Sequence, residues 1–436
     1  MQVEKCPALL TDAAIICMNS KCMHRNYFNR FNGQVLKLLC SLAFNNIVSR
    51  SLASLRMKSI ITVSRYIVGI LFIFSGLVKA NDPLGLAYKM QEFFEVWAQS
   101  GCLPGLMHAM NDHALAFSVI MITFEIVAGV AVLAGWKMRL FSWLLLVLIV
   151  FFTFLTGYAY LSGKFRSCGC FGDCIPLTPK ASFIKDIVLL LLIFLIFSWR
   201  NRIKPSLSSF GSVCIILLSV VFSIWLQWYV LKHLPVADCL PFKKGNNIPE
   251  KMKIPPDAIP DSTVISFVYE KDGATVEFTS DNFPDDFDDA VYHFIKRYDK
   301  LIRKGNAEPA ISDFVLTTLS GNDTTLQVLS GAGYNAFLFM KDDPGGGEWL
   351  KRFESLYPAL QQQQINLFVV TNNAEEVARY FNSTPHITLL KCDVVPIKTA
   401  ARVNPALYLL QGGTVRNKWS YADWDDAVKT IQTLAN

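Results

Sequence analysis

The sequence has 436 residues, which is enough for two or three domains. It is 52% hydrophobic and only 17% charged, a composition too apolar for an ordinary soluble protein. Its net charge of +6 joins two unlike parts: residues 1–235 carry 21 Lys and Arg against 9 Asp and Glu, and residues 236–436 carry 20 against 26. This pattern predicts a basic membrane domain followed by an acidic soluble domain. No basic stripe typical of nucleic-acid-binding proteins is present, so we expect no nucleic-acid partner.

Residues 1–56 fit neither part, because they are polar and lack the apolar core of a signal peptide. Cys17, Cys22 and His24 could be metal ligands, but their spacing matches no closed ligand set, and we expect no metal site. Met57 directly precedes the first apolar segment. We therefore expect the preceding residues to be a leader that is either not translated or disordered.

Residues 57–235 contain five apolar segments, each near the roughly 20 residues that cross a bilayer. They predict an α-helical polytopic membrane bundle. A further stretch, Asn81–His113, is amphipathic and is expected to lie along the membrane interface without spanning it. The five predicted spans are Ile60–Lys79, Ala114–Trp136, Leu140–Tyr160, Phe183–Trp199 and Phe210–Leu231.

An odd number of spans places residues 80–113, the loop around Cys168 and everything after Leu231 on the same side of the membrane. Dense basic turns at Lys137–Arg139 and Arg200–Lys204 favour a cytoplasmic location for the opposite side. Disulfide chemistry also favours an oxidising exterior for the cysteines. We therefore expect a bacterial inner (plasma) membrane protein whose C-terminal domain faces the periplasm. The cysteines predicted to share that face are Cys102, Cys168, Cys170, Cys174, Cys239 and Cys392.

The loop between the third and fourth spans reads Cys168-Gly-Cys170-Phe-Gly-Asp173-Cys174. A disulfide between Cys168 and Cys170 would be strained, and strained, exposed disulfides exchange readily. Closure from Cys168 to Cys174 is less strained, because two intervening glycines let the chain turn back. The pattern indicates either a redox loop or a structural loop held by one disulfide.

Local charge distinguishes the three loop cysteines. Two basic residues, Lys164 and Arg166, precede Cys168 and favour its thiolate, whereas Asp173 disfavours the thiolate of Cys174. Cys168 is therefore the predicted attacking sulfur, with Cys170 or Cys174 as the resolving sulfur.

Two charged residues lie inside predicted spans. Glu125 is near the middle of the second span, where a carboxylate is costly and usually faces a partner or a cavity. It either has a function, such as transport or ligand binding, or forms a structural pair with Arg65 or Lys79. Arg65 lies near the start of the first span and could extend its side chain to the membrane surface.

Spaced motifs in the first two spans are Arg65-x3-Gly69-x-Leu71-Phe72-x2-Ser75-Gly76-x2-Lys79 and Glu125-x3-Gly129-x5-Gly135-x3-Arg139. They resemble the first two helices of the DoxX family, and the Cys168 loop resembles that of the related MauE branch. The resemblance covers residues 58–235. It implies thiol and sulfur redox chemistry for DoxX relatives and disulfide-dependent maturation of a periplasmic dehydrogenase subunit for MauE-type proteins.

Residues 236–305 begin with the proline-spaced segment Ile248–Pro260, which predicts an extended linker. Two β-rich runs, Val264–Glu270 and Ala274–Thr279, flank an Asp-Gly pair and predict a β-hairpin. The segment Asp286–Lys304 is then predicted to form an amphipathic helix.

Residues 306–436 show an alternating strand and helix order that predicts an α/β domain. The opening Asp313-Phe314-x-Leu316 and a proline before the penultimate strand resemble a redoxin domain of the thioredoxin fold, which implies that Pro405 is its cis-proline. Where a redoxin carries its cysteines, this chain has Lys341–Trp349 and no sulfur. A nucleophile has no substitute there, so we expect this domain to be redox-silent. Cys392 is expected to be a buried, apolar cysteine.

Two functions remain open. The first is a membrane thiol–disulfide protein whose loop exchanges with a periplasmic client, a thiol-redox protein or a quinone, although the sequence requires no cofactor. The second is a non-enzymatic membrane scaffold whose redox-silent domain binds a client protein.

Overall fold

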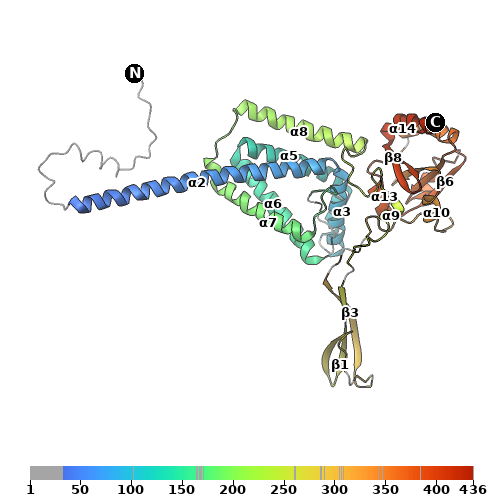
Figure 1. The fold of residues 1–436 in the computed structure, drawn as a ribbon, viewed down its shortest axis with the longest axis horizontal. Coiled ribbons are helices and arrows are strands. Elements are labelled where there is room, and N and C mark those ends of the chain that lie inside the picture. Colours follow the sequence, from blue (N-terminus) through green and yellow to red (C-terminus); the bar gives the residue numbers. More distant parts are fainter. Residues whose placement is uncertain are drawn as a thin grey trace. The chain divides into compact units, whose positions relative to one another are not determined.

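The computed structural model describes residues 33–435, apart from residues 102, 164, 166–168, 170, 260–261, 285–286, 289, 304, 306, 308, 342, 346 and 383. The loop cysteines Cys168 and Cys170 therefore lie outside the described residues, as does most of the predicted leader. The chain divides into two compact units that alternate along the sequence (Figure 1). One unit is Met1–Phe74, Glu125–Cys168 and Thr178–Ser219, and the other is Ser75–Phe124, Gly169–Leu177 and Val220–Asn436.

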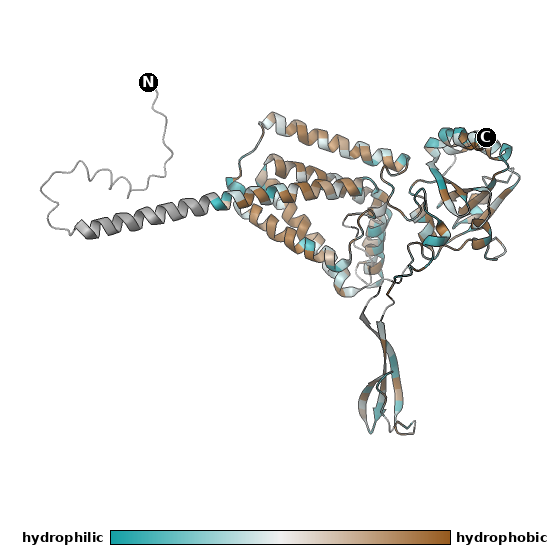
Figure 2. Ribbon diagram, in the orientation of Figure 1, coloured by the Kyte–Doolittle hydropathy of each residue, from teal (hydrophilic) through white to brown (hydrophobic). Residues whose placement is uncertain are grey.

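Five of the described helices are long and apolar enough to cross a membrane, which confirms the predicted spans. The chain is thus a multi-pass membrane protein, and Figure 2 shows the hydrophobic residues concentrated on these helices. α2 begins upstream of the predicted first span, and its spanning part is Arg56–Ala80. The five helices are α2 (Gly33–Ala80), α5 (Ala114–Ala134), α6 (Met138–Ser162), α7 (Pro179–Trp199, followed by η1, Arg200–Arg202) and α8 (Ser209–Lys232).

Glycines let α2 and α5 approach closely within the first unit. A Cβ atom on Gly129 would lie 2.8 Å from the carbonyl oxygen of Gly69 and 2.8 Å from the side chain of Ile73. Neither backbone can move away without opening the helix pair. Gly69 and Gly129, two of the glycines in the motifs that resemble the DoxX family, therefore have a packing role, as small residues commonly do between membrane helices.

Two shorter helices, α3 (Pro83–Gln99) and α4 (Pro104–Asp112), follow α2. They bury a small apolar cluster that includes Phe94 and Met107. At about 1.5 Å per residue, neither helix reaches across the roughly 30 Å core of a bilayer, in agreement with the expectation that this stretch does not span. Asp82 caps the start of α3: its Oδ1 accepts a hydrogen bond from the Gly85 amide at 3.0 Å.

The C-terminal part of the second unit contains a five-stranded α/β sheet in the order β6-β5-β4-β7-β8. β4, β5 and β6 run parallel, β7 pairs antiparallel with β4, and β8 pairs antiparallel with β7. The strands are β4 (Tyr334–Met340), β5 (Asn366–Thr371), β6 (Ile387–Lys391), β7 (Ala406–Gln411) and β8 (Thr414–Ser420). This confirms the predicted α/β order, although β6 was not foreseen.

Helices cover both faces of this sheet because every central strand carries apolar side chains on both sides. One face packs against α11 (Glu348–Gln362) and α14 (Trp424–Gln432), with the fully buried Trp424 at its centre. The other face packs against short elements and loops, with Phe314 and Tyr408 among its largest buried side chains. The remaining helices of this part are α9 (Ile248–Lys251), α10 (Thr325–Leu329), α12 (Ala374–Ala378), α13 (Val394–Ala400), η2 (Tyr421–Asp423) and η3 (Thr433–Ala435).

A separate three-stranded sheet, in the order β2-β1-β3, precedes the α/β sheet in the chain. β1 (Ser262–Lys271) and β2 (Ala274–Thr279) form the predicted hairpin. Its turn residues Asp272 and Gly273 both have positive φ, as a tight two-residue hairpin turn requires. The helix predicted over Asp286–Lys304 is wrong. Its described part contains β3 (His293–Arg303), which pairs antiparallel with the free edge of β1.

The segment predicted to be an extended linker also differs from expectation. It begins with α9, and Ile248 is completely buried in the core of the α/β sheet. The Ile248 amide donates to the Gly413 carbonyl in the β7–β8 turn at 2.9 Å. Residues around Ile248 are thus part of the α/β domain, because their apolar side chains complete one face of its core.

Candidate functional site

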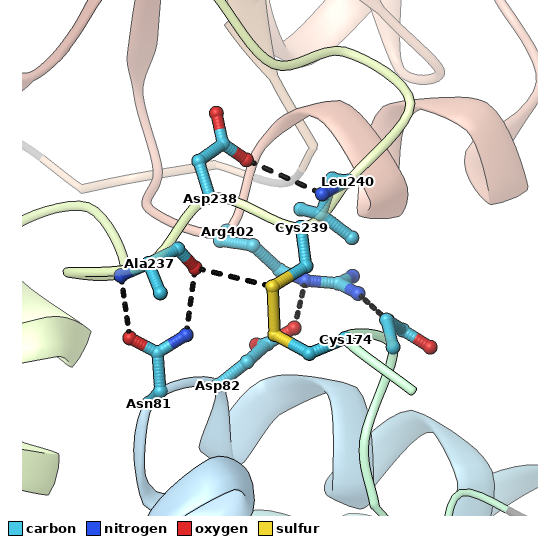
Figure 3. The surroundings of a disulfide bond; sticks show 9 residues. Asn81, Asp82, Cys174, Ala237, Asp238, Cys239, Leu240 and Arg402 are labelled. Atoms are coloured by element: carbon cyan, nitrogen blue, oxygen red, sulfur yellow. Dashed lines mark hydrogen bonds and ion pairs between the residues drawn. A yellow bond between two sulfur atoms is a disulfide. The ribbon is translucent and has the colours of Figure 1, made fainter. Parts of the chain in front are cut away.

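A disulfide joins Cys174, in the loop between α6 and α7, to Cys239, just after α8, with 4.8 Å between their Cα atoms. Both cysteines are half-buried, and Figure 3 shows their surroundings. The expected closure from Cys168 to Cys174 is therefore wrong. The Cys174 sulfur is bonded to a cysteine that lies 65 residues later in the chain, after two further membrane helices.

The loop that carries Cys174 turns back at its glycines, as predicted. The Gly172 amide donates to the Gly169 carbonyl at 3.1 Å, and both residues have positive φ. A Cβ on Gly169 would lie 3.1 Å from the side chain of Lys89 on α3, so the loop lies directly on that helix. The turn brings Cys174 to Cys239 because the segment that contains Cys239 is also held next to the start of α3.

The Cys239 segment is held from two sides. Asn81, between α2 and α3, both donates to the Ala237 carbonyl at 2.8 Å and accepts from the Ala237 amide at 2.9 Å. Asp238 forms an ion pair with Lys418 of β8, at 2.6 Å between Oδ2 and Nζ. Burial lowers the pKa of Lys418, and the neighbouring Asp238 opposes that shift. These contacts position Cys239 beside the loop between α6 and α7.

The Cys239 sulfur lies 3.7 Å from the Ala237 carbonyl oxygen. A disulfide sulfur carries no hydrogen, so in the oxidised state this is a contact without a donor. Reduction would give Cys239 an S–H group already directed at an acceptor. The site can therefore accommodate the thiol form without losing a hydrogen bond.

Arg402 lies beside the disulfide and links three segments (Figure 3). Its side chain is only 6% exposed, and its Nε donates to Asp82 Oδ2 at 2.8 Å. Its Nη2 donates to Asp173 Oδ2 at 2.7 Å, and its Nη1 to the Lys398 carbonyl at the end of α13 at 2.7 Å. Each guanidinium nitrogen thus has an acceptor, the arrangement that a buried charge requires.

Electrostatic effects within this triad oppose one another. Burial raises the pKa of Asp82, and Asp173 acts in the same direction, whereas Arg402 and the Gly85 amide lower it. For Arg402, burial lowers the pKa, but Asp82 and Asp173 together outweigh that effect and raise it. Arg402 therefore stays charged, and the two carboxyl groups depend on it. Asp173, predicted as a site residue for its effect on Cys174, instead contacts Arg402.

A group of cations surrounds Tyr88 of α3, next to Arg402. The Lys341 Nζ donates to the Tyr88 hydroxyl at 3.1 Å, and the Arg402 and Lys398 charges lie 5.4 and 5.1 Å from the centre of its ring. These distances suit cation–π contacts. Lys341 directly follows β4. This corner of the sheet therefore faces α3 through cations.

Pro405 follows a cis peptide bond, which confirms the predicted cis-proline. The neighbouring Asn404 Oδ1 accepts a hydrogen bond from the Lys341 amide at 3.2 Å. Pro405 thus lies at the same corner of the sheet as Lys341 and Arg402.

Cys392 is buried, as predicted, and burial raises the pKa of its thiol to about 12. It immediately follows β6, and its amide donates to the Thr371 carbonyl of β5 at 3.0 Å. A thiol with so high a pKa is almost entirely protonated at neutral pH and is a poor nucleophile.

The predicted intramembrane charges are both in the first unit. Glu125 is 2% exposed, but no described contact tests its role, which stays a prediction. Arg65 is half-buried and donates to the carbonyls of Val132 at 3.2 Å and Leu133 at 3.0 Å. These carbonyls lie in the last turn of α5, where backbone acceptors lack the amide partners that they have in the middle of a helix. Arg65 thus closes the end of the second span.

A third intramembrane charge, Asp186 of α7, was overlooked. It is completely buried, forms an ion pair with Lys185 at 2.6 Å, and accepts a hydrogen bond from the Thr156 hydroxyl of α6 at 3.0 Å. The adjacent Lys-Asp pair within a predicted span was the signal that could have revealed it.

The structure thus places Cys174, Asp173 and Pro405, from the predicted site residues, in one unit, and Arg402 contacts Asp173 among them. It does not describe Cys168 or Cys170. Sequence reasoning missed Arg402 and Asp82, which have no local motif. The parity of the spans did place Cys239 on the same side as Cys174, and the disulfide confirms that shared side.

Residues 57–199, which cover the first four spans, match the family described as Methylamine utilisation protein MauE. Residues 263–304 match a domain of unknown function, DUF8463, over the three-stranded sheet. Protein TlpB from Flavobacterium psychrophilum is 32% identical over 120 residues, which are 27% of this chain and 32% of that protein. The chain thus covers about a third of the length of this relative. No solved structure matches. The membrane part of the chain is therefore similar to the MauE family, as its cysteine loop indicated.

Proposed function

We propose that this chain is a membrane protein of thiol–disulfide chemistry, acting at the outer face of a bacterial inner membrane through Cys168, Cys170 and Cys174. The observation that carries the proposal is the Cys174–Cys239 disulfide. It is half-buried, and Cys174 belongs to the same short motif as two further cysteines. A disulfide placed within a few residues of two thiols has attacking groups close at hand.

The exchange can be written with all atoms accounted for. A thiolate at Cys168 or Cys170 attacks the Cys174 sulfur, the bond to Cys239 breaks, and Cys239 leaves as a thiolate that takes up a proton. This step moves the disulfide without net oxidation. A client dithiol would then be oxidised by the loop disulfide, two electrons and two protons passing to the loop cysteines. Reoxidation requires a two-electron acceptor, for which we propose a membrane quinone that is reduced to the quinol.

The C-terminal domain would position the loop rather than react. We propose that it is a redox-silent domain of thioredoxin-like fold, which the cis-proline at Pro405 and the order of its strands support. Its Arg402 holds Asp173, directly before Cys174. Lys341 takes the place of a nucleophile at the end of β4. The function of maturing a periplasmic client by disulfide exchange fits this division, as the MauE resemblance implies.

A specific observation favours the alternative of a non-enzymatic scaffold. Arg402, Asp82 and Asp173 already hold the same segments as the disulfide, and the one described cysteine of the sheet, Cys392, is unreactive by its pKa. In that reading the disulfide is a permanent crosslink, and the C-terminal domain binds a client.

Thiol trapping separates the two functions. In the redox function, Cys239→Ala leaves Cys174 without its partner, and a mixed disulfide with a client should accumulate in native membranes. Cys170→Ala should trap a different adduct on Cys168, because the resolving sulfur is absent. Mass spectrometry of alkylated, non-reduced membranes measures both.

Cys214→Ala is the matched control, because Cys214 is an exposed free thiol on α8. If neither Cys239→Ala nor Cys170→Ala traps a partner, and both only lower protein abundance, the redox function fails and the scaffold function stands.

A further inference from the structure

The outer edge of β6 is open over most of its length. Hydrogen bonds identify which groups point outward: the Cys392 amide bonds inward to Thr371 of β5, whereas the Lys391 amide and carbonyl both bond outward to Thr317, at 2.8 and 2.9 Å. Because strand residues alternate in direction, the backbone groups of Leu389 also point outward. Within the described part of the chain they have no partner. Thr317 therefore covers one end of the edge and leaves the rest available.

A groove of about 610 Å³ borders this edge. Thr388 and Leu390 of β6 and Phe368 of β5 lie along it, and α10 and the turn before β5 also contribute to its wall. Its volume is within the range of about 300–1,000 Å³ typical of ligand sites. The groove lies at the opposite end of β4 from Lys341 and so does not belong to the disulfide site.

The lining of the groove has no charge among its described residues and is rich in amides. The side chains of Gln327, Gln363 and Gln364 have no hydrogen-bond partner among the residues described. Asn366 donates to Asn335 at 3.3 Å across β5 and β4, and both still have hydrogen-bonding capacity. Free amides beside an apolar floor suit a ligand that has alternating donors and acceptors but no net charge.

We propose that this edge and groove bind an extended polypeptide segment with uncharged side chains, which adds a strand beside β6. The Leu389 amide and carbonyl would pair with its backbone, as in other cases of strand addition. Alternate side chains of the segment would enter the groove, next to Thr388, where the glutamine amides can bond its remaining peptide groups. A charged side chain there would lose its hydration without gaining a counter-ion.

This inference does not rest on the thiol chemistry, because no cysteine takes part. It supplies a place on the C-terminal domain where a client could bind in either function. The strand-addition proposal is tested by a peptide affinity, whereas the thiol function is tested by a trapped disulfide. The failure of one therefore does not imply the failure of the other.

The test uses the full chain in lipid nanodiscs and a phage-displayed library of random 12-residue peptides, with empty nanodiscs to remove lipid binders. The most enriched peptide is synthesised and its Kd measured. Leu389→Pro removes the outward amide without breaking a bond to β5, because proline is tolerated where its nitrogen faces away from the sheet. Its matched control is Leu389→Ala, which keeps the amide.

We expect Leu389→Pro to weaken binding at least tenfold and Leu389→Ala less than twofold. Thr388→Arg, which places a charge in the groove, should also weaken binding. Resistance of Cys392 to alkylation shows that the sheet of each variant is intact, because Cys392 directly follows β6. Hydrogen exchange at the Leu389 amide in the unmodified chain should slow when the peptide binds.

The proposal is overturned if no peptide is enriched over empty nanodiscs, or if the enriched peptide binds Leu389→Pro and Leu389→Ala equally. It is also overturned if binding slows exchange elsewhere but not at Leu389.

Discussion

The Cys174–Cys239 disulfide and Cys392, the cysteines described in the second unit, differ in burial and in the polarity of their surroundings. The Cys174–Cys239 disulfide is half-buried and lies close to Arg402 and Asp238 (Figure 3). Both of these residues form ion pairs. Cys392 lies in the apolar core beneath β6, where burial raises its thiol pKa to about 12. One sulfur site is polar and accessible, and the other is apolar and closed.

This difference indicates that the thiol reactivity of a cysteine in this chain depends on the groups around its sulfur. It does not depend on whether the cysteine belongs to the α/β domain. A thiolate needs solvent or nearby cations to be stable, and only the disulfide site provides them. The α/β sheet offers cations at Lys341 and Arg402 but no sulfur beside them.

The largest expected effect is on alkylation rate. After mild reduction at pH 8, Cys392 should be alkylated about 10³-fold more slowly in the folded protein than in the unfolded chain, because burial raises its pKa to about 12, against about 8.5 for an ordinary thiol. Cys239 should be slowed far less, because its side chain is only half-buried. The rate at Cys392 should keep rising about tenfold per pH unit up to pH 11, since its raised pKa keeps it protonated. Mass spectrometry with iodoacetamide measures both rates.

The unfolded chain is the control for that comparison, because both cysteines should then react alike. Equal rates in the folded protein would show that Cys392 is accessible and that burial does not separate the two sulfurs.

The next effect concerns the ion pairs that surround the disulfide. Arg402→Met leaves Asp82, which is 12% exposed, and Asp173 without their cation, and breaking a buried pair in this way costs about 3–5 kcal/mol. Urea unfolding in detergent, followed by tryptophan fluorescence, measures the loss.

Lys429→Met is the matched control, since the Lys429–Asp426 pair is exposed to solvent, where water and salt screen the two charges and leave little net stabilisation. Adding Asp82→Asn and Asp173→Asn to Arg402→Met should restore part of the stability, because no unpaired charge then remains. A cost for Arg402→Met no larger than the control would mean that water reaches the triad.

The smallest effect should come from the disulfide itself. A closed loop of this length corresponds to about 4 kcal/mol of chain entropy. The membrane helices α7 and α8 already return the chain to the same side, so we expect Cys239→Ala to cost only about 2 kcal/mol. Cys174→Ala and the double variant should cost the same amount, since each removes one bond.

Unfolding with and without reductant measures that cost, and reduced wild-type protein should match the variants. If removing the disulfide changes the free energy of unfolding by close to zero, the disulfide is not a structural crosslink, and a freely exchanging disulfide is favoured. Cys214→Ala, which changes a cysteine outside any disulfide, controls for substitution alone.

Features of the fold that depend on short stretches of neighbouring residues were predictable from the sequence. Apolar length alone identified the five spans, and an odd number of them placed Cys239 with Cys174. The Asp272-Gly273 pair identified a hairpin, because few residues other than glycine and aspartate accept its turn geometry. Pro405 stood out through its position before a buried strand.

Features that depend on distant partners were not predictable. The β3 strand is amphipathic enough to be taken for a helix, and only the open edge of β1 decides its conformation. The pairing of Cys174 with Cys239 depends on how Asn81 and Lys418 hold the second cysteine. Arg402 has no motif around it, because its two carboxylate partners lie 320 and 229 residues away in the chain.

The three-stranded sheet has a consequence for how the chain is divided. Its flanking segments meet: the Ile311 amide donates to the Lys251 carbonyl at 3.0 Å, so the α/β domain continues directly from α9 to Ile311. Met252 still packs against the core of that domain, and the residues from 253 to 310 form an insertion whose two ends lie close together. This insertion can be exchanged for a short glycine linker, or for a reporter domain, without breaking any strand pairing of the five-stranded sheet. The Lys251–Ile311 hydrogen bond thus marks the position at which the three-stranded sheet can be separated from the α/β domain or replaced by another domain.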